Sequence, residues 1–140
     1  MVDQYLENPE NHISQGNNID IEVRSILMNK EAWKRRVLDA LEDMSDEQFQ
    51  RRAWTGIGPE ESSLVEVICA LFDDALLREY VAKYCSSLPP KALLDVHDLD
   101  RKIQCLDTDH LDTLPALEVI ENPKWVEIRR IAHNLKMALQ

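Results

Sequence analysis

The residues of this chain best suited to chemistry lie between positions 95 and 110. The run Asp-Val-His-Asp-Leu-Asp, residues 95–100, sets His97 beside Asp98, and further acidic and imidazole groups follow at Asp107, Asp109 and His110. Imidazole and carboxylate groups are ligands that divalent metals accept in proteins. One interpretation is therefore a metal-dependent hydrolase that uses His97 and Asp98.

The spacing of these groups argues against that interpretation. An adjacent His–Asp pair resembles the dyad of all-helical metal-dependent phosphohydrolases, but that family needs further histidines upstream, and none occurs between His12 and His97. Neighbouring residues of a helix also do not share a face. Residues 107–118 lack the glycine that a calcium loop requires at its sixth position. We therefore predict no metal and no cofactor.

Other kinds of catalytic site find no better support. The three cysteines, Cys69, Cys85 and Cys105, are widely spaced in mostly apolar contexts, which predicts buried thiols in a reducing compartment. No glycine-rich phosphate-binding pattern occurs. We predict a cytoplasmic protein without catalytic residues, which is not an enzyme.

The same region is strongly acidic. Residues 95–121 carry eight carboxylates against Arg101 and Lys102, a local charge of −6 in a chain of −10. Leucines, valine and isoleucine recur between the carboxylates at helical spacing, which predicts a folded acidic face rather than a disordered tail. A basic protein is the expected partner. Nucleic acids and anionic membranes are not, because both attract clustered Lys and Arg.

We predict that two groups of carboxylates form charge pairs with this partner. The main electrostatic face comprises Asp95, Asp98, Asp100, Asp107, Asp109 and Asp112. A second patch, around the glycine-containing loop 55–63, comprises Glu60, Glu61, Asp73 and Asp74. Trp54 and Ile57 are the predicted apolar anchors, since buried anchors hold a complex that rim charges steer. For any single carboxylate, a solvated helix face is an equally good interpretation.

A basic cluster on the N-terminal half is interpreted differently. Lys34, Arg35 and Arg36, with Arg51 and Arg52, are interspersed with acidic side chains from Asp39 to Glu47. Pairing within helices at i, i+4 explains this cluster more simply than a nucleic-acid patch.

The elements that position these residues are predicted to be helices. Only three glycines occur, all before position 59, while Leu, Glu, Ala, Lys and Arg are abundant. We predict an all-α, single-domain bundle of about six to eight short and medium helices over residues 19–140, after a polar N-terminal arm, residues 1–18. No apolar run is long enough to span a bilayer, and the N-terminus lacks the pattern of a signal peptide.

Side chains and prolines predict the helix starts. A short helix is expected from Asp20, and later helices are expected to begin at Asn29, Ser45, Ser63, Asp73 or Asp74, Pro90, Pro115 and Pro123, with a connection over residues 106–113. The stripe of the last helix comprises Trp125, Ile128, Ala132, Leu135 and Leu139. We expect the basic residues of this helix, Arg129, Arg130 and Lys136, to face the acidic stretch.

One segment adds a resemblance to known proteins. The stretch RRAWTGIGPEESSLVEVICALFDD, residues 51–74, resembles the immunity proteins of bacterial toxin systems, including those of contact-dependent growth inhibition. The resemblance implies a protein, monomeric before binding, that neutralises one cognate toxin domain, often a basic nuclease, by blocking its active site or substrate groove. A non-catalytic helical adaptor or regulatory subunit, and a small structural domain without a specific ligand, remain open.

Overall fold

The predicted all-α fold is confirmed. The computed structural model describes residues 29–140, and no strand occurs among them. The predicted arm, residues 1–18, and the short helix predicted from Asp20 lie outside the described residues. The elements are α3 (Lys30–Ser45), α4 (Glu47–Ala53), α5 (Leu64–Cys69), the π-helical η2 (Ala70–Asp74), α6 (Leu77–Tyr84), the 3₁₀-helical η3 (Cys85–Ser87), α7 (Pro90–Gln104), α8 (Thr108–Leu111), α9 (Ala116–Ile120) and α10 (Pro123–Leu139).

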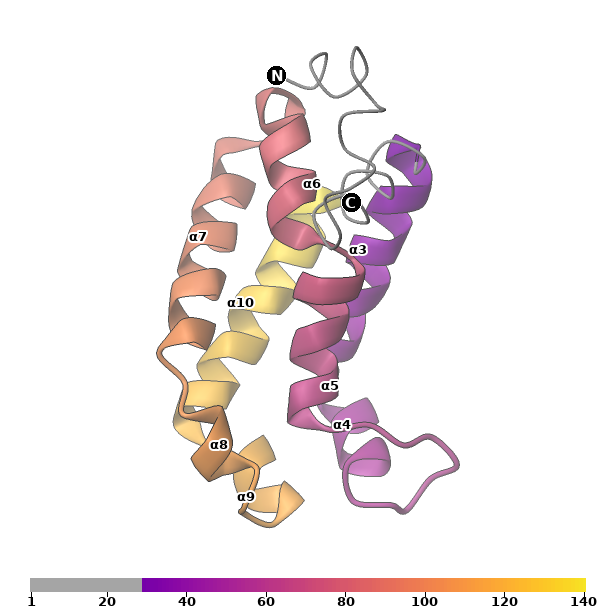
Figure 1. Ribbon diagram of the computed structural model, residues 1–140, viewed down its shortest axis with the longest axis vertical. Helices are drawn as coiled ribbons and strands as arrows, with labels where there is room; N and C mark the ends of the chain where they lie inside the picture. Colours follow the sequence, from indigo (N-terminus) through magenta and orange to yellow (C-terminus); the bar gives the residue numbers. More distant parts are fainter. Residues whose placement is uncertain (1–28) are drawn as a thin grey trace, which may run out of the picture.

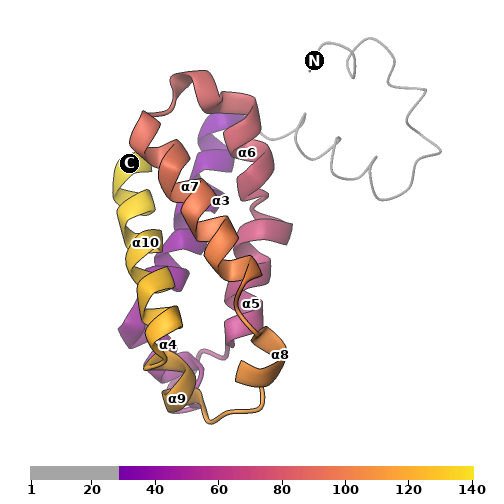
Figure 2. The same ribbon diagram turned by 90° about the vertical axis from the view of Figure 1, so that its left-hand side faces the viewer.

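The helices form an elongated bundle. Four columns run along its length: α3, α7, α10, and a composite column in which α5, η2 and α6 follow one another (Figure 1). The C-terminal helix α10 packs against both α3 and α7 (Figures 1 and 2). The short helices α4, α8 and α9 gather at one end. One continuous hydrophobic core joins the columns.

Several predicted starts are confirmed. Asn29 caps α3 by accepting a hydrogen bond from the Ala32 amide at 2.8 Å. Ser63 caps α5 in the same way, with the Glu66 amide as donor at 3.1 Å. Pro90 and Pro123 are the first residues of α7 and α10, and all five residues of the predicted α10 stripe are buried. Local sequence patterns were sufficient here because each capping side chain accepts a hydrogen bond from a backbone amide only three residues further along the chain.

Other starts differ from the prediction. Ser45 ends α3, donating to the Glu42 carbonyl, and Asp46 caps α4 by accepting from the Phe49 amide at 3.0 Å. Pro115 precedes α9 as its cap, and the predicted connection 106–113 contains α8. These are shifts of one residue or one turn, which cap preferences alone do not distinguish.

The predicted caps Asp73 and Asp74 are wrong. Both belong to η2, and α6 starts after Leu76, which adopts a left-handed conformation with φ of 56°. The buried indole of Trp33, on α3, donates from Nε1 to the Ala75 carbonyl at 2.7 Å. Trp33, from another column, thus donates to a carbonyl at the break between η2 and α6. Local sequence patterns cannot predict a hydrogen-bond partner so far away in the chain.

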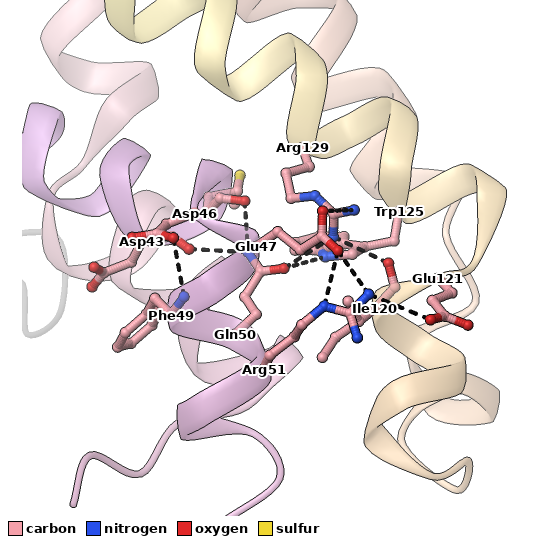
Figure 3. Close-up of polar contacts among 11 residues, drawn as sticks. Asp43, Asp46, Glu47, Phe49, Gln50, Arg51, Ile120, Glu121, Trp125 and Arg129 are labelled. Atoms are coloured by element: carbon pink, nitrogen blue, oxygen red, sulfur yellow. Dashed lines mark hydrogen bonds and ion pairs between the residues drawn. The ribbon is translucent and has the colours of Figure 1, made fainter. Parts of the chain in front are cut away.

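A buried polar side chain ties α4 to the bundle. Gln50, which has no exposed surface, donates from Nε2 to the carbonyls of Asp43 at 3.0 Å and Met44 at 2.8 Å (Figure 3). Its Oε1 accepts from Trp125 Nε1 at 3.0 Å and from Arg129 at 3.2 Å. Arg129 also donates to the Ile120 carbonyl at 3.1 Å, so one network connects α3, α4, α9 and α10.

The prediction of three buried thiols is wrong for two of them. Cys69 is half-buried, whereas Cys85 and Cys105 are exposed. Cys85 lies in the 3₁₀ turn that follows α6, and Cys105 caps α7, so both lie where a helix ends and core packing stops. In the part of the chain described, no helix has both the length and the apolar character that crossing a membrane requires.

Candidate protein-binding surfaces

The carboxylates of α7 are largely paired within the chain. Asp95 pairs with Lys91 at 3.2 Å, Asp98 with Arg101 at 3.0 Å and Asp100 with Arg78 at 2.8 Å. The hydrogen bond from Arg78 lowers the pKa of the Asp100 carboxyl below its usual value. The aspartates of α7 are thus already engaged, which reduces the charge that they present to a partner.

The carboxylates around α8 are more available. Asp107 caps α8 by accepting from the His110 amide at 3.2 Å, and Asp109 and Asp112 are exposed. No ion pair joins these three aspartates to a cation within residues 29–140. Asp112 also borders a pocket of about 200 Å³ whose wall includes Trp54. The α8 end thus combines free carboxylates with an aromatic surface.

The two predicted apolar anchors differ in exposure. Ile57 is 82% exposed on loop 55–63, where Gly56 takes a φ of 79° that lets the chain turn. Trp54 is half-buried and stacks near Trp125, with 5.7 Å between ring centroids. Of the nearby carboxylates, Glu60 lies 3.6 Å from Arg52, while Glu61 is exposed without such a pair among the described residues. Ile57 is therefore the better placed of the two anchors.

A further acidic surface lies between α3 and η2. Asp39 and Asp43, from α3, line a groove of about 330 Å³ together with Asp74 and Arg36, and we call these four residues the acidic groove. Asp73, next to Asp74, is exposed. The structure thus joins a predicted binding residue, Asp74, to two aspartates that the sequence interpretation had assigned to pairing within α3.

Electrostatic crowding distinguishes the acidic groove. Burial, and then the like charges of Glu42, Asp39 and Asp46, raise the pKa of the Asp43 carboxyl above its usual value. No ion pair reaches any aspartate of the groove from the residues that the structure describes. In the sequence, the i, i+4 spacing of Asp39 and Asp43 was the sign that these two carboxylates would share one face of a helix.

Neutralising Asp43 is expected to stabilise the fold. A raised pKa means that the folded state disfavours the ionised carboxyl, so its ionisation destabilises the protein at pH 7. We expect Asp43→Asn to raise the free energy of unfolding by about 0.5 kcal/mol, as removal of like-charge neighbours on a helix does. Urea denaturation at pH 7 measures the change. The control is Asp100→Asn, which should lower stability because the hydrogen bond from Arg78 stabilises the ionised Asp100 carboxyl and lowers its pKa. A loss in both variants would contradict the crowding.

The basic residues of α10 do not face the acidic stretch as a group. Arg129 pairs with Glu47 at 3.5 Å and Lys136 pairs with Glu42, so these two cations face α4 and α3. Arg130 pairs with Glu127 of its own helix. It makes no ion pair with Asp98 or Asp95, although their negative charges help to raise the pKa of its guanidinium group after the larger effect of Glu127. The expectation was therefore wrong for Arg129 and Lys136, and the α7 aspartates pair with Lys91, Arg101 and Arg78 instead.

The intrahelical interpretation of the N-terminal basic cluster holds only in part. Arg51 pairs with Glu47 at 2.7 Å across one turn of α4, but it also reaches Glu121 at 3.3 Å. Arg52 pairs with Glu60 of the following loop. Lys34, Arg35 and Arg36 of α3 make no ion pair with another residue from 29 to 140, and Glu42 of α3 pairs with the distant Lys136.

No metal-binding arrangement is found in the described region. His97 and Asp98 are neighbours on α7, with His97 exposed and Asp98 engaged by Arg101. Among residues 29–140, no three His, Cys, Asp or Glu side chains gather as a metal site would require. The hydrolase interpretation therefore gains no geometric support from this region.

Comparison of the chain with protein-family models, with curated proteins and with solved structures found no significant match. The functional argument consequently depends on the surfaces described above.

Proposed function

We propose that this protein is an immunity protein that binds a basic bacterial toxin domain and blocks its active site or substrate groove. The observation that carries the proposal is the acidic groove, where Asp39, Asp43 and Asp74 outnumber the single cation Arg36 and none of the three aspartates makes an ion pair with another described residue. The Asp43 carboxylate is kept there at a cost in stability, first from burial and then from like charges, and such a cost is typical of a group kept for binding. A cationic partner would remove that repulsion.

The charge of the whole chain favours such an interaction. With a net charge of −10, the protein attracts a basic surface from a distance and accelerates encounter. A toxin nuclease binds phosphates through Lys and Arg, so a folded row of carboxylates can occupy the same groups. Such inhibition needs steric and electrostatic fit alone, with no chemical step by this chain.

The two less paired surfaces have different roles in this proposal. The acidic groove supplies the main charge contact, the carboxylates around α8 supply a second one, and the exposed Ile57 of loop 55–63 supplies an apolar anchor. Both lie outside the α7 row, whose aspartates are held by Lys91, Arg101 and Arg78. Neutralising the groove should therefore weaken binding more than neutralising α7.

The test compares two double neutralisations against the toxin domain encoded directly upstream of this gene, the position that the immunity resemblance implies. We expect Asp43→Asn with Asp74→Asn to slow association about fivefold at low salt, since steering charges act mainly on the association rate. Asp95→Asn with Asp98→Asn is the matched control and should change it less than twofold. Surface plasmon resonance at low and high salt measures both.

The stability of the groove variant makes the result unambiguous. Because Asp43→Asn should raise the free energy of unfolding, slower binding by a more stable protein cannot come from unfolding. Equal association rates for the wild type and the groove variant would contradict the groove as the interface. Absence of any complex with the upstream domain would contradict the immunity function itself.

A further inference from the structure

A second pocket carries the opposite charge. It has a volume of about 350 Å³ and lies where the last turn of α7 passes the first turn of α10, two helices that run side by side (Figure 2). Its wall includes the cations Arg101, Lys102 and Lys124, with one carboxylate, Glu127. In a chain with a net charge of −10, this concentration of positive charge is local and opposite to the rest.

The single carboxylate offsets only part of the positive charge of the pocket, although the charge of Lys102 acts on it. Glu127 is engaged by Arg130, whose hydrogen bond lowers the pKa of the Glu127 carboxyl below its usual value. Arg101 contacts Asp98 at 3.0 Å through one terminal nitrogen of its guanidinium group. The group has five N–H donors, so the others are not used by this contact. Lys102 and Lys124 make no ion pair with any other residue from 29 to 140. Two ammonium groups and part of a guanidinium remain available.

The remaining wall is suited to a small organic molecule. Pro123, Ile128 and Cys105 contribute apolar or weakly polar surface between the cations. A pocket of this volume with apolar walls and a few convergent polar groups is typical of ligand sites. The first turn of α10 and the last turn of α7 bring opposite partial charges to the pocket, so its positive charge comes from the side chains.

We propose that this pocket binds a small molecule through a phosphate or carboxylate group contacted by Lys102, Lys124 and Arg101. Ammonium and guanidinium groups are the usual protein partners of such oxyanions. The inference is independent of the proposed immunity function, because it uses another surface and another charge.

Cys105 provides a reporter inside the pocket. Its thiol is exposed on the wall, and the exposed Cys85, after α6, provides an internal reference outside it. A ligand bound between Lys102 and Lys124 should shield Cys105 from a neutral alkylating reagent such as iodoacetamide. The same ligand should leave the alkylation rate of Cys85 unchanged.

The experiment uses the full chain with pyrophosphate and, separately, citrate as probes, at constant ionic strength adjusted with sodium chloride. We expect millimolar pyrophosphate or citrate to slow alkylation of Cys105 at least threefold, measured by mass spectrometry of the labelled peptides. Protection by pyrophosphate alone assigns a phosphate ligand, and protection by citrate alone assigns a carboxylate ligand.

A charge-matched pair of variants tests the assignment. Lys102→Gln with Lys124→Gln should abolish the protection, whereas Lys83→Gln with Lys91→Gln, which removes two lysines outside the pocket, should preserve it. Isothermal titration calorimetry of the same proteins measures binding directly. Absence of binding by both anions, equal protection of Cys85, or protection that survives in the pocket variant would each overturn the proposal.

Discussion

Replacing Gln50 by methionine should lower the free energy of unfolding by about 3 kcal/mol. Methionine has nearly the same shape but leaves Trp125 Nε1 without its acceptor and two carbonyls of α3 without their donor. A buried polar group left unpaired costs about 1–3 kcal/mol, and Gln50 serves several at once. Urea denaturation at pH 7, followed by tryptophan fluorescence, measures the loss.

The control for this change lies two residues earlier on the same helix. Gln48 is exposed and makes no side-chain hydrogen bond to another described residue, so Gln48→Met should change stability by less than about 0.5 kcal/mol. Glutamine and methionine have similar helix propensities, which removes that contribution from the comparison. Similar losses in both variants would show that the network joining α3, α4, α9 and α10 contributes little.

Replacing Trp33 by phenylalanine should cost about 2–3 kcal/mol. The indole is fully buried, and its Nε1 donates to the Ala75 carbonyl at 2.7 Å, at the break between η2 and α6. Phenylalanine removes this donor and leaves a small cavity, and both losses destabilise a core. Because Leu76 is held in a left-handed conformation there, we also expect faster hydrogen exchange of the first α6 amides.

The control for this change is Trp54→Phe, because the indole of Trp54 makes no hydrogen bond to the described residues like that of Trp33 to Ala75. Its Nε1 is buried but donates to no group of the described residues, and the ring is only half-buried. Trp54→Phe should therefore cost about 1 kcal/mol or less, since it removes ring volume and an unsatisfied donor together. Equal costs for the two substitutions would mean that ring volume, and not the contact with Ala75, stabilises the break.

These two contacts bear on the proposed interface. The Trp33 contact fixes Ala75, and the Ala75 residue lines the acidic groove next to Asp74. Gln50 binds the carbonyl of Asp43, whose side chain lines the same groove. The backbone on both sides of the groove is thus fixed by hydrogen bonds, one buried and one part-buried, which would reduce the rearrangement that binding requires.

The sequence by itself determined the helical architecture and many helix ends. The paucity of glycine, the periodic apolar stripe of the last helix, and the caps at Asn29 and Ser63 are local properties, satisfied within one or two turns of the same helix. For the same reason the sequence correctly predicted Pro90 and Pro123 as first residues. It also established the excess of negative charge, which depends on composition alone.

Only the tertiary structure decided which charges pair beyond one helix turn and which remain free, whereas Lys91–Asp95 and Asp98–Arg101 are pairs within one turn of α7. The aspartates of α7 belonged to the predicted main acidic face, yet packing brought Arg78 to Asp100, and Lys136 pairs with Glu42 of α3 rather than with that face. Packing of α3 against η2 places Asp39 and Asp43 in one groove with Asp74. Packing of α7 against α10 places Arg101, Lys102 and Lys124 around one pocket. Ion pairing depends on distances of a few ångströms between residues far apart in the chain, and helix packing alone sets those distances.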